Sequence, residues 1–262
     1  MKKMKKQSWP LISIFSLSLM ILPTAQAQDR MSRGIGYEET MRWSEAISEY
    51  TEILKDEPEH IEARYRLGIV YEKLGAIDDS LNWHREVLQR NAGHVGARTA
   101  LAGYYMKRGV ELRRNNKSAE AAQAFKQALQ YDADSASAHF ELGQELSTIG
   151  QKDQAIESYK EAVRLEPDMS VAHNQLAGMY SEKGLYQEAM QEYEEVVRLN
   201  PNDPEAYGGL CKVYSELGQR DQAITTLEKS WKGYLKLGRR DLAKPSFELQ
   251  KKLMAEKMAA GQ

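Results

Sequence analysis

Apolar and small side chains recur along this chain at helical spacing, in pairs of short amphipathic segments. In many of these segments an apolar residue is followed by another four positions later, which places both on one face of a helix. Glycines at 75, 150, 184 and 218 interrupt the pattern where a helix has to end, because glycine adopts the left-handed turn conformation without strain. The pattern predicts antiparallel helix pairs, with each helix roughly 12 to 14 residues long.

One spacing recurs through most of the chain. Small residues stand at Gly34, Gly68, Ala102, Gly143, Ala177 and Cys211, separated by 34, 34, 41, 34 and 34 residues. In each unit a second small residue follows, such as Ala155, and a ring or a large aliphatic side chain comes four residues later, such as Tyr159. Neither helix of a pair can bury its apolar stripe alone, so such units stack on their neighbours and share a continuous core.

The segments Leu67-Gly68-Ile69-Val70-Tyr71 and Ala155-Ile156-Glu157-Ser158-Tyr159, with Pro167, resemble the signature of the tetratricopeptide repeat family. The resemblance extends from Gln28 to about Leu235. It implies an all-α fold, a right-handed superhelical solenoid of antiparallel helix pairs in about six repeat units, with a C-terminal capping helix. The implied units span residues 28–60, 61–94, 95–135, 136–169, 170–203 and 204–237, and the capping helix spans 238–262.

The third unit departs from the common spacing because it contains seven extra residues. Seven residues are close to two turns of an α-helix, so an insertion of this length preserves the helical phase. We therefore expect its first helix to run from Ala97 to about Asn115, with Asn116 in the left-handed turn. The end of this helix is basic, since it carries Lys107, Arg108, Arg113, Arg114 and Lys117. It is either a solvated helix end, whose cations are favourable at the negative end of the helix dipole, or a docking site for an acidic partner or an anionic lipid.

The last segment, residues 238–262, is expected to form one more helix. Apolar residues from Phe247 to Met258 alternate there with lysines. A terminal repeat needs a cap with a polar outer face, which favours a capping helix. The alternative is a basic amphipathic helix that lies on a membrane surface.

The first 27 residues have the features of a secretory signal peptide. Four lysines precede an apolar stretch of about 12 residues, and Ala25-Gln26-Ala27 offers a cleavage site after Ala27. The apolar stretch is shorter than the ~20 residues of a membrane-spanning helix. The sequence therefore predicts an exported, periplasmic protein, and the alternatives are a secreted protein or one tethered to the inner membrane by an uncleaved signal helix.

Charge and composition exclude several kinds of partner and site. The net charge is −2, and removal of the four leading lysines leaves 32 basic against 38 acidic residues, or −6. A nucleic acid is not expected as a partner, because its phosphates would meet no general positive field. The single cysteine, Cys211, cannot form an internal disulfide, and no Cys/His spacing suits a metal. The sequence leaves the oligomeric state open.

No set of catalytic residues accompanies the repeats. The sequence contains no His-Glu-x-x-His, no phosphate loop and no Gly-x-Ser-x-Gly. The residues His84, His139 and His173 occupy helix positions that predict packing roles, and Cys211 is expected to be buried at the small position of the sixth unit. These features favour a protein without enzymatic activity, cofactor or metal.

The resemblance implies a concave groove lined by the first helix of each unit, where family members hold extended peptides or partner helices. The groove positions carry over to Tyr65, Ile69, Lys73, Thr99, Met106, Phe140, Gln144, Asn174 and Lys212. The apolar members among these residues either receive hydrophobic anchors of a bound chain or pack against a neighbouring first helix. The sequence thus indicates a scaffold or adaptor of the bacterial cell envelope that binds a protein or peptide partner. The alternative is an adaptor tethered by its signal helix or its basic C-terminal helix, and a membrane surface is a secondary partner.

Overall fold

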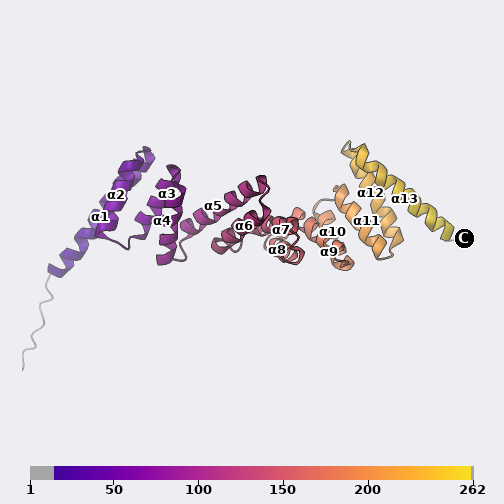
Figure 1. The fold of residues 1–262 in the computed structure, drawn as a ribbon, viewed down its shortest axis with the longest axis horizontal. Coiled ribbons are helices and arrows are strands. Elements are labelled where there is room, and N and C mark those ends of the chain that lie inside the picture. Colours follow the sequence, from indigo (N-terminus) through magenta and orange to yellow (C-terminus); the bar gives the residue numbers. More distant parts are fainter. Residues whose placement is uncertain (1–14, 261–262) are drawn as a thin grey trace, which may run out of the picture. The chain divides into compact units, whose positions relative to one another are not determined.

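The computed structural model describes residues 15–260, with side chains from Ala25 to Ala259. These residues form thirteen α-helices and include no strand. The chain divides between Leu101 and Ala102 into two compact units. Within each unit consecutive helices lie side by side as hairpins (Figure 1). The predicted all-α fold of stacked helix pairs is therefore confirmed.

In most pairs the two helices are similar in length. In the first unit they are α1 (Phe15–Glu39), α2 (Trp43–Asp56), α3 (Ile61–Lys73), α4 (Ile77–Arg90) and the start of α5 (Val95–Arg114). In the second unit they are the rest of α5, α6 (Ser118–Tyr131), α7 (Ala136–Thr148), α8 (Lys152–Leu165), α9 (Ser170–Glu182), α10 (Tyr186–Leu199), α11 (Pro204–Glu216), α12 (Arg220–Lys236) and α13 (Arg240–Ala260). Most of them have 13 or 14 residues, as the pattern predicts, whereas α1 has 25, α5 has 20, α12 has 17 and α13 has 21.

The pairs are held together where a ring on the second helix lies against the backbone of the first. A Cβ atom added to Gly68 would lie 2.5 Å from Cε1 of His84, and one added to Gly143 would lie 2.7 Å from Cε1 of Tyr159. The His84 and Tyr159 side chains are each 1% exposed. The small residue is thus required because the ring occupies the space of its missing side chain.

The long helix α5 ends as the sequence predicts, with Asn116 in the left-handed conformation at φ 58°. The residue of α5 that faces Phe125 of α6, however, is Gly109, since a Cβ there would lie 2.5 Å from Cε1 of Phe125. The repeat spacing identifies Ala102 as the small residue of this unit, but in the structure Gly109 is the residue that the ring approaches. Seven residues are nearly two turns, so Ala102 and Gly109 share one helix face and only the packing distinguishes them. Gly109 precedes Gly143 by 34 residues, so the repeat spacing holds when it is counted backward.

The last helix, α13, packs along α12, and its Ala243 and Gln250 are only 4% and 7% exposed. The predicted capping helix is therefore confirmed. Together, α12 and α13 form the last hairpin of the second unit (Figure 1).

The predicted signal peptide, residues 1–27, lies largely outside the residues that the structure describes. The helix α1 runs through the predicted cleavage position, and Ala27 is 5% exposed in a cluster with Tyr50 and Ile53. Among the described residues, no helix combines the length and the apolar character needed to cross a membrane.

Two glycines of α5 test the assignment of Gly109. A Cβ at Gly103 meets no atom within 4 Å, so we expect Gly103→Ala to stabilise the chain by about 0.5–1 kcal/mol through helix propensity. Gly109→Ala is expected to destabilise it by about 1–3 kcal/mol, because the Phe125 ring must shift. Urea denaturation followed by circular dichroism measures both changes. The same effect at both positions would contradict the assignment.

Candidate functional site

The candidate groove residues of the first unit differ in how open they are. Tyr65 of α3 is half-buried, and its ring lies 5.5 Å from the ring of His84 and 4.6 Å from that of His94. A Cβ on Gly96 would collide with the Tyr65 ring, so the start of α5 encloses this side chain. Tyr65 thus packs against neighbouring helices, which is the second of the two roles considered for it. The remaining candidates of this unit are the half-buried Ile69 and the exposed Lys73 and Thr99.

The candidates on α5 and α7 of the second unit are also engaged within the protein. The Phe140 ring lies 5.8 Å from the Tyr159 ring, and Met106 packs against the same core cluster. The side-chain oxygen of Gln144 accepts a hydrogen bond of 3.0 Å from Arg113. These three side chains contribute to packing more than to an open surface. The remaining candidates in this unit are the half-buried Asn174 and the exposed Lys212.

The basic end of α5 is mostly neutralised by carboxylates of its own unit. Arg113 forms ion pairs with Glu141 and, at 2.7 Å, with Glu145, whose side chain is only 3% exposed. The other pairs are Arg108 with Glu111 at 3.1 Å and Lys117 with Glu120 at 3.1 Å. Of the five cations at this helix end, only Lys107 and Arg114 form no ion pair within the described part of the chain. This arrangement suits a solvated helix end better than a docking site for an acidic partner.

His84 of α4 is buried without a hydrogen bond. Among the described residues neither of its ring nitrogens has a partner. Burial lowers the pKa of His84, Glu72 opposes this effect, and His94 adds to it. The ring is therefore neutral at pH 7, and its role is packing, as the sequence predicts.

His173 of α9, in contrast, is held by two acceptors. Its Nδ1 atom lies 2.6 Å from Oε2 of Glu192, and its Nε2 atom lies 2.9 Å from the carbonyl oxygen of Pro167. The bond to Glu192 raises the pKa of His173, against the effect of burial. Because the folded pKa is raised, the stability from this contact is complete below the unfolded value of about 6.5 and is lost as the pH rises through the folded pKa. His173 thus joins α9 to α10 and to the preceding loop.

An open pocket of about 420 Å³ lies between α11 and α12. The Tyr207 side chain forms its floor, is 8% exposed, and donates a hydrogen bond of 3.2 Å to the Pro201 carbonyl. Two small residues of α12 allow the helices to approach closely at the pocket. The Ser230 hydroxyl donates to the carbonyl of Pro204 at 2.8 Å, and a Cβ on Gly233 would lie 3.0 Å from Cβ of Pro204.

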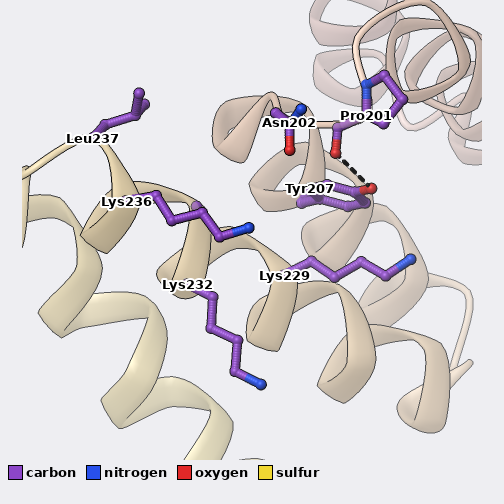
Figure 2. Close-up of a pocket in the computed structure, with 8 residues that line it drawn as sticks. Pro201, Asn202, Tyr207, Lys229, Lys232, Lys236 and Leu237 are labelled. Carbon is purple, nitrogen blue, oxygen red and sulfur yellow. Dashed lines mark hydrogen bonds between the residues drawn. The ribbon is translucent and has the colours of Figure 1, made fainter.

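The charge of this basic pocket comes from three lysines on one side of α12. Lys229, Lys232 and Lys236 line it, and Lys229 and Lys236 extend beside Tyr207 whereas Lys232 points away (Figure 2). The Lys229 Nζ atom is 5.1 Å from the centroid of the Tyr207 ring. Lys232 is paired with Glu228. Lys229 and Lys236 form no ion pair in the part of the chain described here, so the pocket offers two cations and an aromatic ring to a ligand.

The sequence pattern did not predict this pocket, although the spacing of its three lysines is visible in the sequence. Residues 229, 232 and 236 are three and four positions apart, which places three cations on one helix face. The signal was hidden because α12 exceeds the usual repeat length and its extra turn carries Lys236. Only the packing of α12 against the loop before α11 turns this cationic face into a pocket.

Comparison with protein families identifies the repeats. A tetratricopeptide repeat model matches residues 33–95, 106–146 and 140–204, and a second one matches residues 180–232. The first model alone matches more than half of the chain. Its match is interrupted between 95 and 106, inside α5, where the repeat spacing also breaks.

Solved structures show the same fold. A crystal structure of MamA superposes with a TM-score of 0.50 at 22% identity and covers 66% of this chain and 97% of that one. The structure of YrrB, described as a TPR protein with an unusual peptide-binding site, has a TM-score of 0.52 at 18% identity and covers 76% and 97%. At these identities the similarity concerns the fold alone. No curated protein matches the sequence.

The orphaned imidazole of His84 generates a prediction about stability. Its folded pKa is lowered, so protonation below the unfolded value of about 6.5 favours the unfolded chain. We expect His84→Phe to raise the melting temperature, because a buried polar group without a partner is removed and the family's ring is restored. The gain should grow as the pH falls from 7 to 5. Thermal melts at both pH values measure it, and a gain that shrinks toward pH 5 would contradict the neutral, buried imidazole.

Proposed function

The chain belongs to the tetratricopeptide repeat family, and from this premise we propose that it is a protein-interaction scaffold that holds an acidic segment of a partner protein. The observation that carries this proposal is the basic pocket between α11 and α12, where Lys229 and Lys236 have no carboxylate partner among the described residues. The proposed role is that of a scaffold or adaptor rather than an enzyme.

The chemistry of the pocket favours an acidic peptide. A carboxylate can lie between Lys229 and Lys236, and an apolar or aromatic side chain of the same segment can lie on Tyr207. The volume of about 420 Å³ is within the range of peptide and small-ligand pockets, and it holds a few side chains rather than a duplex. The mildly acidic chain as a whole does not provide the field that a nucleic acid requires.

A row of open positions on the first helices is a second location for the partner chain. Asn174 and Lys212 lie on α9 and α11 of the second unit and form no hydrogen bond or ion pair among the described residues. Ile69, Lys73 and Thr99 are the corresponding open positions of the first unit. The peptide-binding site reported for YrrB supports the idea that a chain of this fold can hold a peptide. We place the acidic segment in the basic pocket and the rest of the partner along Asn174 and Lys212 of the second unit.

The proposed location is the bacterial cell envelope, with export to the periplasm directed by residues 1–27. The support is the sequence of this segment, with its lysines, apolar stretch and Ala25-Gln26-Ala27. Secretion and an inner-membrane tether are the alternatives. The burial of Ala27 against Tyr50 and Ile53 gives the tether a structural argument, because a chain that keeps its leader retains this contact.

Charge reversal in the basic pocket tests the proposed function. A short fluorescein-labelled peptide that interleaves glutamate with phenylalanine should bind the full chain, and added salt should weaken the complex. The double variant Lys229→Glu, Lys236→Glu should bind it about tenfold or more weakly, since two attractions become repulsions. Fluorescence anisotropy measures the affinity.

The matched control is Lys107→Glu, which reverses an equally unpaired lysine on α5. It should leave the affinity unchanged. If both variants lose the peptide to the same extent, binding depends only on the net charge and the pocket is not the site.

Export and cleavage can be tested directly. When the full-length gene is expressed in a Gram-negative host, we expect the protein in the periplasmic fraction with Gln28 as its first residue. Edman sequencing of the purified protein provides the measurement. A first residue before Gln28, with the protein in the membrane fraction, would establish the tethered form instead.

A further inference from the structure

The last helix follows the same docking pattern as the first helices of the repeats. In α11 the residues that face the preceding second helix include Ala206 and Val213, both 0% exposed, and in α13 the corresponding residues are Ala243 and Gln250. The residues of each pair are seven apart, and the pair on α13 lies 37 residues after the pair on α11. The three residues beyond 34 are accounted for by α12, which has 17 residues where the other second helices have 14.

Hydrogen bonds fix this position of α13. The Trp231 Nε1 atom donates to the side-chain oxygen of Gln250 at 2.8 Å, and the Gln250 amide donates to the carbonyl of Ile224 at 3.2 Å. Gln250, a polar residue at a position that is apolar in the repeats, therefore has hydrogen-bond partners for its buried amide. The surface that α12 and α13 form together is well defined.

One position on α13 is not covered as it is in the repeats. Counting 37 residues from Leu210 leads to Phe247. The leucines at this position of the repeat units are at most 5% exposed, namely Leu67, Leu101, Leu142, Leu176 and Leu210. Phe247 is 40% exposed, because in the described residues no second helix follows α13. A ring that the repeat pattern places in the core thus lies open.

Phe247 forms one wall of an apolar crevice between α12 and α13. The crevice has a volume of about 490 Å³ and is lined also by Trp231, Leu235 and Ala243. The Trp231 and Phe247 rings meet edge to face with centroids 5.3 Å apart. Leu235 is 46% exposed. The hollow is therefore large enough for an apolar side chain of a partner.

The crevice also has a charge. Arg240 and Lys244 line it, and neither forms an ion pair in the part of the chain that the structure describes. A third cation, Lys251, lies 5.4 Å from the centroid of the Phe247 ring, but it is paired with Glu248 at 3.7 Å. An occupant with carboxylates beside its apolar residues would match this arrangement.

The geometry favours a helix over a membrane as the occupant. Of the exposed apolar residues of α13, Phe247, Met254 and Met258 share one helix face, whereas Leu249 lies about 200° around the helix from Phe247. The cations Arg240, Lys244 and Lys251 stand on the same face as Phe247, so α13 does not separate an apolar side from a charged one. An interfacial helix needs its apolar residues on one side. The concave crevice instead suits an inserted side chain of a partner helix.

We propose that this crevice binds an acidic amphipathic helix of a partner protein, which inserts an apolar side chain against Phe247 and Trp231 and places its carboxylates beside Arg240 and Lys244. The site lies on a different side of α12 from the basic pocket, because Trp231 and Leu235 are not on the helix face of Lys229 and Lys236. It is therefore independent of the proposed function.

The test uses the full chain and a labelled peptide with the sequence of residues 186–199, a helix of the required chemistry. This segment contains Glu188, Glu192, Glu194 and Glu195, and its apolar face includes Ala189, Tyr193 and Val196. Anisotropy should show saturable binding. Phe247→Ser and Lys244→Glu should each weaken binding about tenfold, through the lost anchor and the reversed charge.

The matched controls lie on the same helix. Leu249→Ser removes an apolar side chain of similar exposure, 43%, and Lys252→Glu reverses a lysine outside the crevice, and both should bind the peptide as the unchanged protein does. Lys244 is exposed, so Lys244→Glu remains informative even if Phe247→Ser fails to fold in a circular dichroism melt.

Several results would overturn the proposal. The first is that the peptide does not bind, and the second is that the control variants lose as much affinity as Phe247→Ser and Lys244→Glu. The third is that Lys229→Glu weakens binding, which would assign the peptide to the basic pocket. A fourth is binding to phosphatidylglycerol vesicles that Lys244→Glu abolishes while peptide binding is unaffected, which would assign the crevice to a membrane surface.

Discussion

The close approach of a ring to the backbone of the preceding helix determines how each pair is built. At Gly68, Gly109 and Gly143 the ring of the second helix occupies the place of a side chain, so the two helices lie closer than a larger residue would allow. Where the small residue is Ala177, the ring of Tyr193 instead collides with any Cβ placed on Gly209 of the next helix pair. The rest of the core follows from where these rings find space.

The same constraint explains why α5 is long. Its first part keeps the spacing of the first unit, with Ala97 and Leu101 completely buried, and its second part keeps the spacing of the second unit through Gly109 and Leu112. Seven residues separate the two frames, and since seven is close to two turns, one continuous helix can satisfy both. The family match is interrupted at this place for the same reason.

The two surfaces proposed to bind partners, the basic pocket and the apolar crevice, lie where α12 and α13 depart from the repeat pattern rather than in the regular units. In the regular units, candidate groove residues such as Tyr65 and Phe140 are used for packing. The three additional residues of α12 lengthen the helix face that carries the lysines beside Tyr207. They also shift the start of α13 by three residues relative to the repeat spacing. Glu248 and Lys251 of α13 stand 37 residues after Cys211 and Tyr214, so α13 has polar residues at two core positions of the repeat, and Phe247 beside them is exposed.

The sequence by itself determined the helix pairs, their turns and their repetition, because the spacing of leucine, glycine and tyrosine is a local consequence of helix geometry. It predicted the long α5 with its Asn116 turn, the burial of Cys211 at 3% exposed, and the packing role of His84. Only the tertiary structure decided that Gly109 rather than Ala102 receives Phe125, since both lie on one helix face. It also decided that Gln144 is bound by Arg113 and that three lysines of α12 line a pocket. Which of several equivalent faces meets a neighbour depends on the distance between helices, and this distance is a property of the packed units rather than of any local stretch of residues.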